Sequence, residues 1–144
     1  MSIEVPRQLF EEIVAHARAG APNEACGVLA GVEDKGVRFY AMRNAEESPA
    51  AYRFDTDEQG RVFHEVEERG LDLLAFVHSH THTEPYPSPR DVRLALWDDP
   101  VTGERGPAHP GTRYLIVSLM DEEPRVRAFA IEGPDPVEEE VVVT

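Results

Sequence analysis

The sequence predicts an α/β layer structure, and three observations support this prediction. Short apolar segments with the character of strands alternate along the chain with segments in which apolar residues recur at helical spacing. One strand candidate, residues 71–78 (LDLLAFVH), is apolar almost throughout, which is typical of a strand buried on both faces of a sheet. The chain of 144 residues is 41% hydrophobic, which fits a single domain, residues 1–144, with a substantial core.

The first helix is expected over residues 6–19. Pro6 suits the first helical position, because proline lacks the N–H that this position leaves unpaired in any case. Leu9 and Ile13 lie on one face of the predicted helix, and Gly20 is a suitable residue to end it.

Three short strands are expected next. The first reads EACGVLAG, and a turn at residues 33–36 separates it from the second. A loop over residues 44–50 precedes the third. The predicted strands span residues 24–31, 37–42 and 51–54.

A second helix is expected over residues 56–69, with Asp55 or Thr56 as its N-cap. The buried strand 71–78 follows it directly. This strand carries two histidines at its C-terminal end.

A third helix begins at Ser88, with Pro89 at its first position and Asp91 at its third, and runs to about Leu96. Residues 98–111 contain proline, glycine and charge without periodicity, so we expect a long loop there.

The end of the chain is predicted to form a hairpin of residues 112–119 and 125–131. Residues 132–144 are acidic and rich in proline. We expect them to be an irregular extension, in which residues 141–143 add at most a short edge strand.

The net charge of −14 disfavours nucleic-acid binding, because phosphate contacts require clustered Lys and Arg. Binding to an anionic membrane surface is disfavoured for the same reason. A basic partner would be attracted, although solubility is the simpler explanation of the charge. No apolar run is long enough to span a bilayer, and the first residues lack the features of a secretory signal, so a cytoplasmic protein is expected.

The single cysteine, Cys26, excludes an internal disulfide and a cysteine-rich structural zinc site. It also excludes the usual zinc deaminase site, which needs two or three cysteine ligands. Cys26 as a nucleophile is less favoured than Cys26 as a small buried hydrophobe. A serine or cysteine hydrolase stays open, and insensitivity to chelators would identify one.

The most informative motif is H-x-H-x7-S-x-x-D, formed by His78, His80, Ser88 and Asp91. Alternate side chains of a strand leave the same face, so both imidazoles can converge on one point. Two imidazoles and a carboxylate suit a divalent metal such as Zn²⁺ that keeps one position open for a bound water. His82 lies past the strand and is expected to be exposed or to face the substrate.

Each residue of this motif also has a simpler explanation. The histidines could be a surface pair, and the carboxylate of Asp91 is favoured by the helix dipole without any metal. Ser88 is more simply a helix cap than the donor that stabilises an oxyanion.

A hydrolytic metal site also needs a base to accept a proton from water. Four acidic residues are candidates. Glu24 is preferred because it begins a buried apolar strand, where an ionised side chain is costly without a purpose. The candidates are Glu24, Glu84, Asp98 and Asp99.

The chain resembles the JAMM (MPN-plus) metalloproteases. Their signature is a Glu in an E-x-C-G-hydrophobic-x-x-G strand followed by the H-[ST]-H-x7-S-x-x-D motif, and residues 24–31 and 78–91 fill every position of it. The similarity covers residues 3–131 and is strongest to the bacterial single-domain branch. That branch includes enzymes that release cysteine from a ubiquitin-like sulfur carrier protein.

The resemblance implies a mixed central β-sheet flanked by helices, similar to the cytidine deaminase fold. It implies one Zn²⁺ held by His78, His80 and Asp91 with a bound water, Glu24 as general acid and base, and Ser88 as oxyanion donor. The substrate would be a peptide or isopeptide bond after the glycine tail of a ubiquitin-like protein, with a sulfur carrier protein preferred.

Two alternatives stay open within this family: a non-catalytic scaffold of the same fold, and a deubiquitinase-like isopeptidase with another ubiquitin-like substrate. The long 97–111 loop and the acidic end of the chain depart from the branch and bear on which substrate is bound. The oligomeric state is open, with a homodimer as one option.

Overall fold

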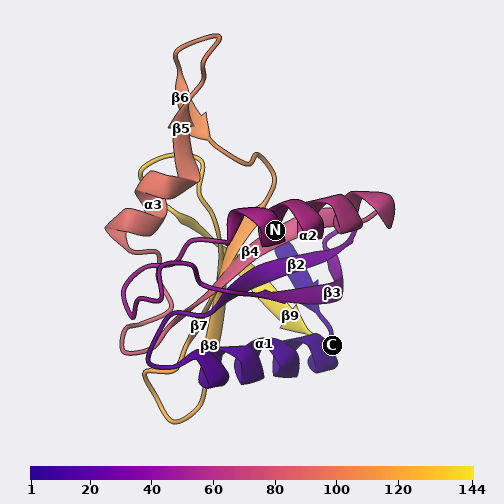
Figure 1. Ribbon diagram of the computed structural model, residues 1–144, viewed down its shortest axis with the longest axis vertical. Helices are drawn as coiled ribbons and strands as arrows, with labels where there is room; N and C mark the ends of the chain where they lie inside the picture. The colour runs from indigo at the N-terminus through magenta and orange to yellow at the C-terminus, as the bar shows by residue number, and fades with distance from the viewer.

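Seven strands form one closed sheet in the order β1-β3-β2-β4-β7-β8-β9, and β5 and β6 form a separate two-stranded sheet. The computed structural model describes residues 1–144 (Figure 1). The elements are β1 (Ser2–Val5), α1 (Arg7–Gly20), β2 (Cys26–Val32), β3 (Lys35–Met42), α2 (Thr56–Glu68), β4 (Asp72–His80), α3 (Pro89–Ala95), β5 (Leu96–Asp98), β6 (Arg105–Pro107), β7 (Arg113–Ser118), β8 (Arg125–Ala130) and β9 (Val137–Val143).

Strand β4 lies in the middle of the sheet, as its apolar sequence predicts. It pairs antiparallel with β2 and parallel with β7, and its last seven residues are all buried. Parallel pairing also joins β1 to β9, so the sheet is mixed and the predicted α/β class is confirmed. The ring closes weakly between β1 and β3, where one residue pair, Glu4 with Lys35, connects the strands.

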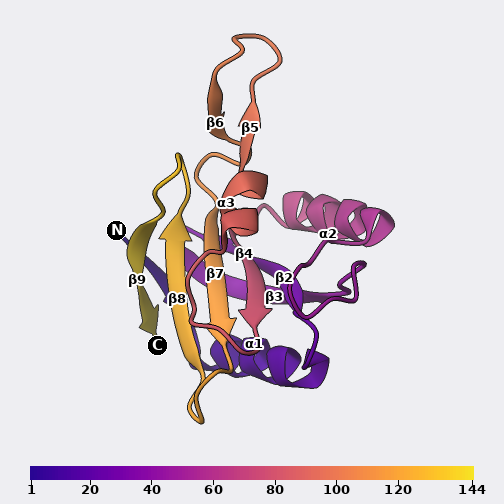
Figure 2. The same cartoon turned by 90° about the vertical axis from the view of Figure 1, so that its left-hand side faces the viewer.

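The apolar core has two parts, one on each face of β4. The first packs against the buried face of α1, which includes Leu9 and Ile13. The second packs against Val66 of α2 and Ala95 of α3. Figures 1 and 2 show α1 on one side of the sheet and α2 and α3 toward the other.

The helix ends agree closely with the sequence. The side chain of Asp55 accepts a hydrogen bond from the backbone N–H of Glu58 and caps α2. Ser88 caps α3 in a reciprocal arrangement with Asp91. Pro6 takes the cap position before α1 and not the first helical position, which differs from the prediction by one residue.

The predicted 97–111 loop is wrong, because β5 and β6 form a hairpin that extends from the body beyond α3 (Figure 2). The hairpin turn is organised by polar groups. Asp99 Oδ1 accepts hydrogen bonds from the N–H groups of Val101 and Thr102, and Gly103 has a positive φ of 75°. This turn chemistry outweighs the lack of an alternating apolar pattern.

The irregular 132–144 extension is also wrong, because β9 is a strand paired on both sides, with β8 and with β1. Two of its three carboxylates have arginine partners. Glu138 pairs with Arg127 at 2.7 Å, and Glu139 pairs with Arg113 at 3.0 Å. Two of the charges that argued against a strand are therefore compensated by arginines of β7 and β8.

Two smaller differences concern β1 and the predicted 51–54 strand. Strand β1 has no counterpart among the predicted elements. The 51–54 segment forms only an isolated bridge, between Phe54 and Asn44. The Asn44 side chain donates to the carbonyl of Ala51, so a side chain replaces part of a strand partner there.

Candidate metal centre

The two histidines of the H-x-H motif meet at the C-terminal end of β4. His78 is 1% exposed and His80 is 5% exposed, and their Nε2 atoms lie 3.2 Å apart. His80 Nδ1 lies 2.8 Å from the carbonyl oxygen of Glu84. Donation of the Nδ1 proton to that carbonyl leaves the Nε2 lone pair free and holds the ring in place.

Asp91 reaches the same point from the first turn of α3. Its Oδ2 atom lies 3.2 Å from His78 Nε2 and 3.3 Å from His80 Nε2. The same oxygen accepts a 2.8 Å hydrogen bond from the backbone N–H of Ser88, whose Oγ accepts from the N–H of Asp91 in return. The capping box therefore fixes the carboxylate that the metal site requires.

The surroundings of Asp91 favour its ionised form, which is the form that binds a metal. Burial opposes the ionisation of Asp91, but hydrogen bonds to His78 and His80 outweigh it and hold the pKa of Asp91 well below its usual range. For His80, burial acts to lower the pKa, and the contacts with Asp91 and the Glu84 carbonyl outweigh it and raise the pKa.

The geometry of these three ligand atoms fits a tetrahedral ion. Zinc with metal–ligand distances of about 2.0–2.1 Å holds its ligand atoms about 3.3–3.4 Å apart. The three observed separations are 3.2, 3.2 and 3.3 Å. The His-His-Asp group therefore fits a zinc site with the predicted ligands His78, His80 and Asp91.

Glu24 lies just before β2 and is 6% exposed. Its Oε1 atom is buried and has no hydrogen-bond partner within the chain. Burial raises the pKa of Glu24, and the nearby His78 and His80 lower it in part. An unpartnered carboxylate beside a metal site can accept and return a proton.

The other base candidates are placed elsewhere. Asp98 and Asp99 belong to the β5–β6 hairpin, where Asp98 pairs with Arg105 and Asp99 organises the turn. Glu84 is exposed, and only its backbone carbonyl reaches His80. His82 is exposed, as predicted.

Cys26 is buried, and burial raises the pKa of its thiol to about 12. A thiol that stays protonated at neutral pH is a poor nucleophile. The structure agrees with the packing role predicted for Cys26.

Sequence reasoning missed three residues that support the centre. Tyr52 stacks on His78, with ring centroids 4.7 Å apart and an interplanar angle of 22°. Ser79 Oγ accepts a 2.7 Å hydrogen bond from the N–H of Ala25. Asn44 Nδ2 donates to the carbonyl of Glu24 at 3.0 Å. The only signal in the sequence was the small hydroxyl residue between the two histidines.

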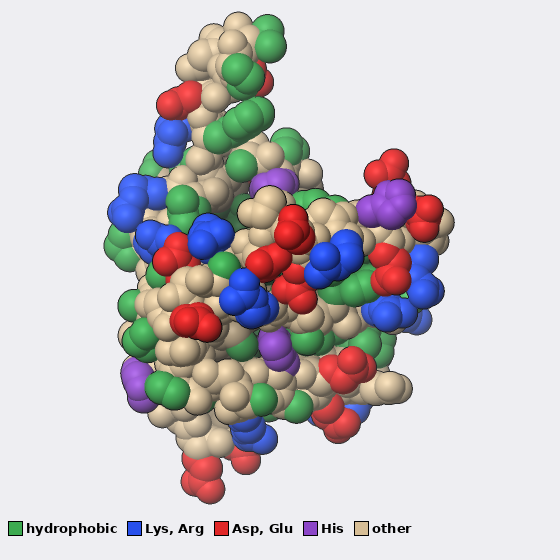
Figure 3. Space-filling model, viewed as in Figure 1, with side chains coloured by type: hydrophobic (Ala, Val, Ile, Leu, Met, Phe, Trp, Pro, Cys, Tyr) green, Lys and Arg blue, Asp and Glu red, His purple; other side chains and the backbone are tan.

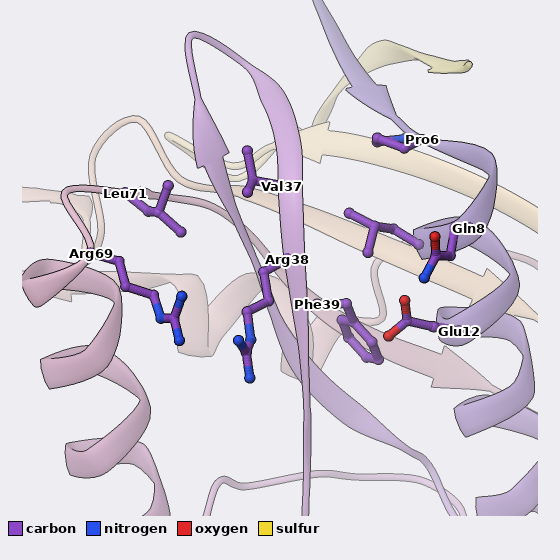
Figure 4. A pocket seen from close by; sticks show the side chains of 9 residues that line it. Pro6, Gln8, Glu12, Val37, Arg38, Phe39, Arg69 and Leu71 are labelled. Atoms are coloured by element: carbon purple, nitrogen blue, oxygen red, sulfur yellow. The ribbon is translucent and has the colours of Figure 1, made fainter.

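A cavity of about 500 Å³ lies between α1, β3 and the end of α2 (Figure 4). Its lining includes Gln8 and Glu12 of α1 and Arg38 of β3. Arg69, which directly follows α2, also lines it. It contains none of the residues of the metal centre. A second cavity, of about 210 Å³, has Asp91 in its lining and is the one that borders the candidate metal centre.

A family model described as prokaryotic homologs of the JAB domain matches residues 6–132. The chain belongs to the prokaryotic JAB family. The resemblance stated from the motifs is thereby confirmed, and the JAB match includes all five predicted site residues.

Two curated relatives are similar to this chain over most of its length. A protein from Mycobacterium tuberculosis named CysO-cysteine peptidase is 43% identical over 115 residues, covering 78% of this chain and 70% of the relative. A desampylase from Haloferax volcanii is 35% identical over 115 residues, covering 75% of this chain and 74% of the relative.

Two solved structures are similar to this chain in fold. The solution structure of a protein from Desulfitobacterium hafniense superposes with a TM-score of 0.82 at 32% identity, covering 100% of this chain and 93% of that one. A JAB1/MPN domain protein from Archaeoglobus fulgidus superposes with a TM-score of 0.58 at 21% identity, covering 97% and 96%. The second similarity concerns the fold alone and confirms the predicted MPN architecture. None of the three helices is long and apolar enough to cross a membrane.

Proposed function

We propose that this chain is a zinc metallopeptidase that hydrolyses the bond after the glycine tail of a ubiquitin-like sulfur carrier protein and releases cysteine or a short C-terminal adduct. The observation that carries the proposal is the unpartnered, buried Glu24 carboxylate beside three ligand atoms spaced for a tetrahedral ion. The peptidase named among the relatives supports the substrate class.

The roles of the ligands follow from their contacts. His78, His80 and Asp91 would hold the zinc ion. When bound, zinc acts as a Lewis acid that acidifies a coordinated water and polarises the carbonyl of the substrate. The 2.8 Å contact between His80 and the Glu84 carbonyl and the capping box of Asp91 keep these ligands oriented.

Glu24 is assigned as the group that moves the proton. Its raised pKa suits a carboxylate that accepts a proton from the attacking water and returns it to the leaving amine. The C–N bond breaks, the hydroxyl group stays on the carbonyl carbon and the proton ends on the amine, so the hydrolysis balances.

Ser88 is assigned as a donor to the carbonyl oxygen. Its Oγ already accepts the capping hydrogen bond from Asp91, which uses one lone pair. Its own proton makes no hydrogen bond within the chain and is free for the developing negative charge. The oxygen of the Ser88 hydroxyl thus caps α3, and its proton remains available for the proposed catalytic role.

The direct experiment follows a carrier protein that ends in Gly-Gly and is extended by one cysteine. Mass spectrometry should detect loss of that cysteine with the zinc-loaded protein and none after chelation. Glu24→Gln should lower kcat by at least roughly 100-fold, which is the size of general acid–base catalysis, and should still bind zinc. Glu84→Gln, which alters an exposed carboxylate, is the matched control and should keep full activity. Full activity in Glu24→Gln would contradict the proposal.

The desampylase among the relatives favours a second candidate, an isopeptidase for another ubiquitin-like protein. The chemistry at the metal centre would be the same, and the leaving group would be a lysine side chain. A carrier joined to lysine through an isopeptide bond separates the two functions. A non-catalytic scaffold of this fold is disfavoured, because the metal ligands and Glu24 are all retained.

A further inference from the structure

A cavity of about 210 Å³ borders the metal centre on the side of α3. Asp91 forms part of its lining, and Tyr52, which stacks on His78, forms part of its wall. Most of the remaining wall is apolar or aromatic, including Phe54, Phe76 and Tyr114.

The segment that carries Tyr52 is tied to Glu24. Asn44 Nδ2 donates to the carbonyl oxygens of Glu24 and Ala51, both at 3.0 Å. The N–H of Glu24 donates to the carbonyl of Ser48 at 2.9 Å. Because Glu24 is the proposed proton donor to the leaving amine, we place the leaving side of the bond next to this segment.

The size and chemistry of the cavity suit the side chain of the residue that leaves. The glycine tail of a carrier has no side chain to fill a cavity, so the nearest side chain belongs to the residue that leaves. An apolar cavity of roughly 150 Å³ accommodates a benzene ring. At about 210 Å³, the cavity here has room for any side chain from cysteine to phenylalanine.

One cation, Arg53, also lines the cavity. Its Nε donates to Glu46 at 3.2 Å, and both side chains are exposed, so this ion pair is weak. The two terminal nitrogens of Arg53 make no hydrogen bond within the chain. They can donate two parallel hydrogen bonds to the two oxygens of a carboxylate. Figure 3 shows basic side chains over α3 and the surface beside it, with acidic side chains among them.

We propose that this cavity binds a single leaving residue, with its apolar or thiol side chain inside the cavity and its free α-carboxylate on Arg53. The inference rests on the proposed function and makes it more specific. The protein would act as a carboxypeptidase on the carrier, in preference to cleaving long extensions or isopeptide bonds, because only a terminal residue has that carboxylate.

The experiment uses the zinc-loaded full chain and carriers that end in Gly-Gly-X, where X is cysteine, alanine, phenylalanine or aspartate. Each carrier is prepared with a free carboxylate and as the C-terminal amide. Wild type should prefer phenylalanine and cysteine to aspartate, and the acid to the amide by roughly tenfold in kcat/KM, the size of one charge-assisted contact at an exposed site. Arg53→Met should raise KM for the acid by a similar factor with little change in kcat. It should leave the amide unaffected.

Two variants complete the design. Arg53→Lys keeps the positive charge but loses the paired donors of the guanidinium group. It should therefore retain part of the preference for the acid over the amide. Arg93→Met removes an exposed arginine of α3 that does not line the cavity, and it should behave as wild type.

The outcomes distinguish this inference from the function on which it rests. Release of X at equal rates from acids and amides, unchanged by Arg53→Met, would overturn the inference and leave the peptidase in place. Equal rates for phenylalanine and aspartate would overturn the role of the cavity. No release from any carrier would contradict the proposed function itself.

Discussion

Ser79, between the two histidines of the metal centre, accepts a hydrogen bond of 2.7 Å from the N–H of Ala25. Ala25 directly follows Glu24, and its carbonyl accepts from the N–H of Ser79 at 3.0 Å. The strand alternation that sends both imidazoles to the candidate metal centre thus sends the hydroxyl to the backbone that holds the proposed base.

Replacing Ser79 with alanine should therefore affect both stability and catalysis. A buried N–H without a partner costs about 1–3 kcal/mol, so we expect the free energy of unfolding in urea to fall by that amount. We also expect kcat to fall while zinc affinity stays unchanged. Thr102→Ala is the control, because it removes a hydroxyl that accepts a hydrogen bond in an exposed turn. It should lower the free energy of unfolding by less than about 0.5 kcal/mol, as surface substitutions usually do. Equal losses in the two variants would contradict this account.

Zinc should stabilise the fold through His78. At a free zinc concentration of about 100 times Kd, the free energy of unfolding should rise by about 2.7 kcal/mol. His78→Ala should abolish most of this increase, because one of three ligands is lost, whereas His82→Ala, at an exposed position, should retain it. Thermal unfolding with and without zinc measures both. Retention of the increase in His78→Ala would remove this histidine from the ligand set.

Tyr52 should matter for zinc affinity through its ring. The ring packs against His78, so Tyr52→Ala frees the imidazole to rotate, and we expect zinc to bind roughly tenfold more weakly, as for other residues that orient ligands. Tyr52→Phe keeps the stacked ring and should bind zinc as wild type does. Competition with a chromogenic chelator provides the measurement. A loss in Tyr52→Phe equal to that in Tyr52→Ala would assign the effect to the hydroxyl.

Arg113 should be one of the most sensitive positions outside the centre. Its side chain is 8% exposed and pairs with Glu139 of β9 at 3.0 Å and with Asp34 at 2.6 Å. Arg113→Met leaves the Glu139 carboxylate, itself 11% exposed, without its partner, and we expect a loss of about 3 kcal/mol of unfolding free energy. Adding Glu139→Gln should recover part of this loss. Recovery by less than the error of the measurement would show that the pair is not the cause.

The contact of Arg113 with Asp34 should make the free energy of unfolding depend on pH. The hydrogen bond from Arg113 lowers the pKa of Asp34. A carboxylate with a lowered pKa contributes stability above its unfolded pKa of about 3.9 and loses it as the pH falls through the lower folded value. The difference in unfolding free energy between wild type and Asp34→Asn should be present at pH 6, stay under about 1 kcal/mol because Asp34 is half-exposed, and shrink as the pH falls below the unfolded pKa and through the lower folded one. A difference that grows toward acid pH would have the wrong sign.

The clustering of the candidate metal ligands could be predicted from sequence because its geometry is local. His78 and His80 share a face through strand alternation, and the Ser88–Asp91 spacing is that of a capping box, so each pair is fixed within a few residues. Glu24 was identified by a different argument, the cost of burying a charge in an apolar strand.

The residues around the centre could not be predicted, because their contacts are long-range. Asn44 and Tyr52 come from a segment with no regular structure, and its packing depends on how the chain folds over β2 and β4. Strand β9 was missed because a run of carboxylates indicates an exposed, solvated segment. Their partners Arg113 and Arg127 are distant in sequence and come close only in the folded sheet.

The position of β9 has a consequence for shortened versions of the protein. Because this strand joins β8 to β1, deleting residues 137–144 would leave two open rows of backbone N–H and C=O groups. Such rows recruit strands from other molecules. A version trimmed of its acidic end would lose solubility and aggregate, even though every residue of the metal centre is present.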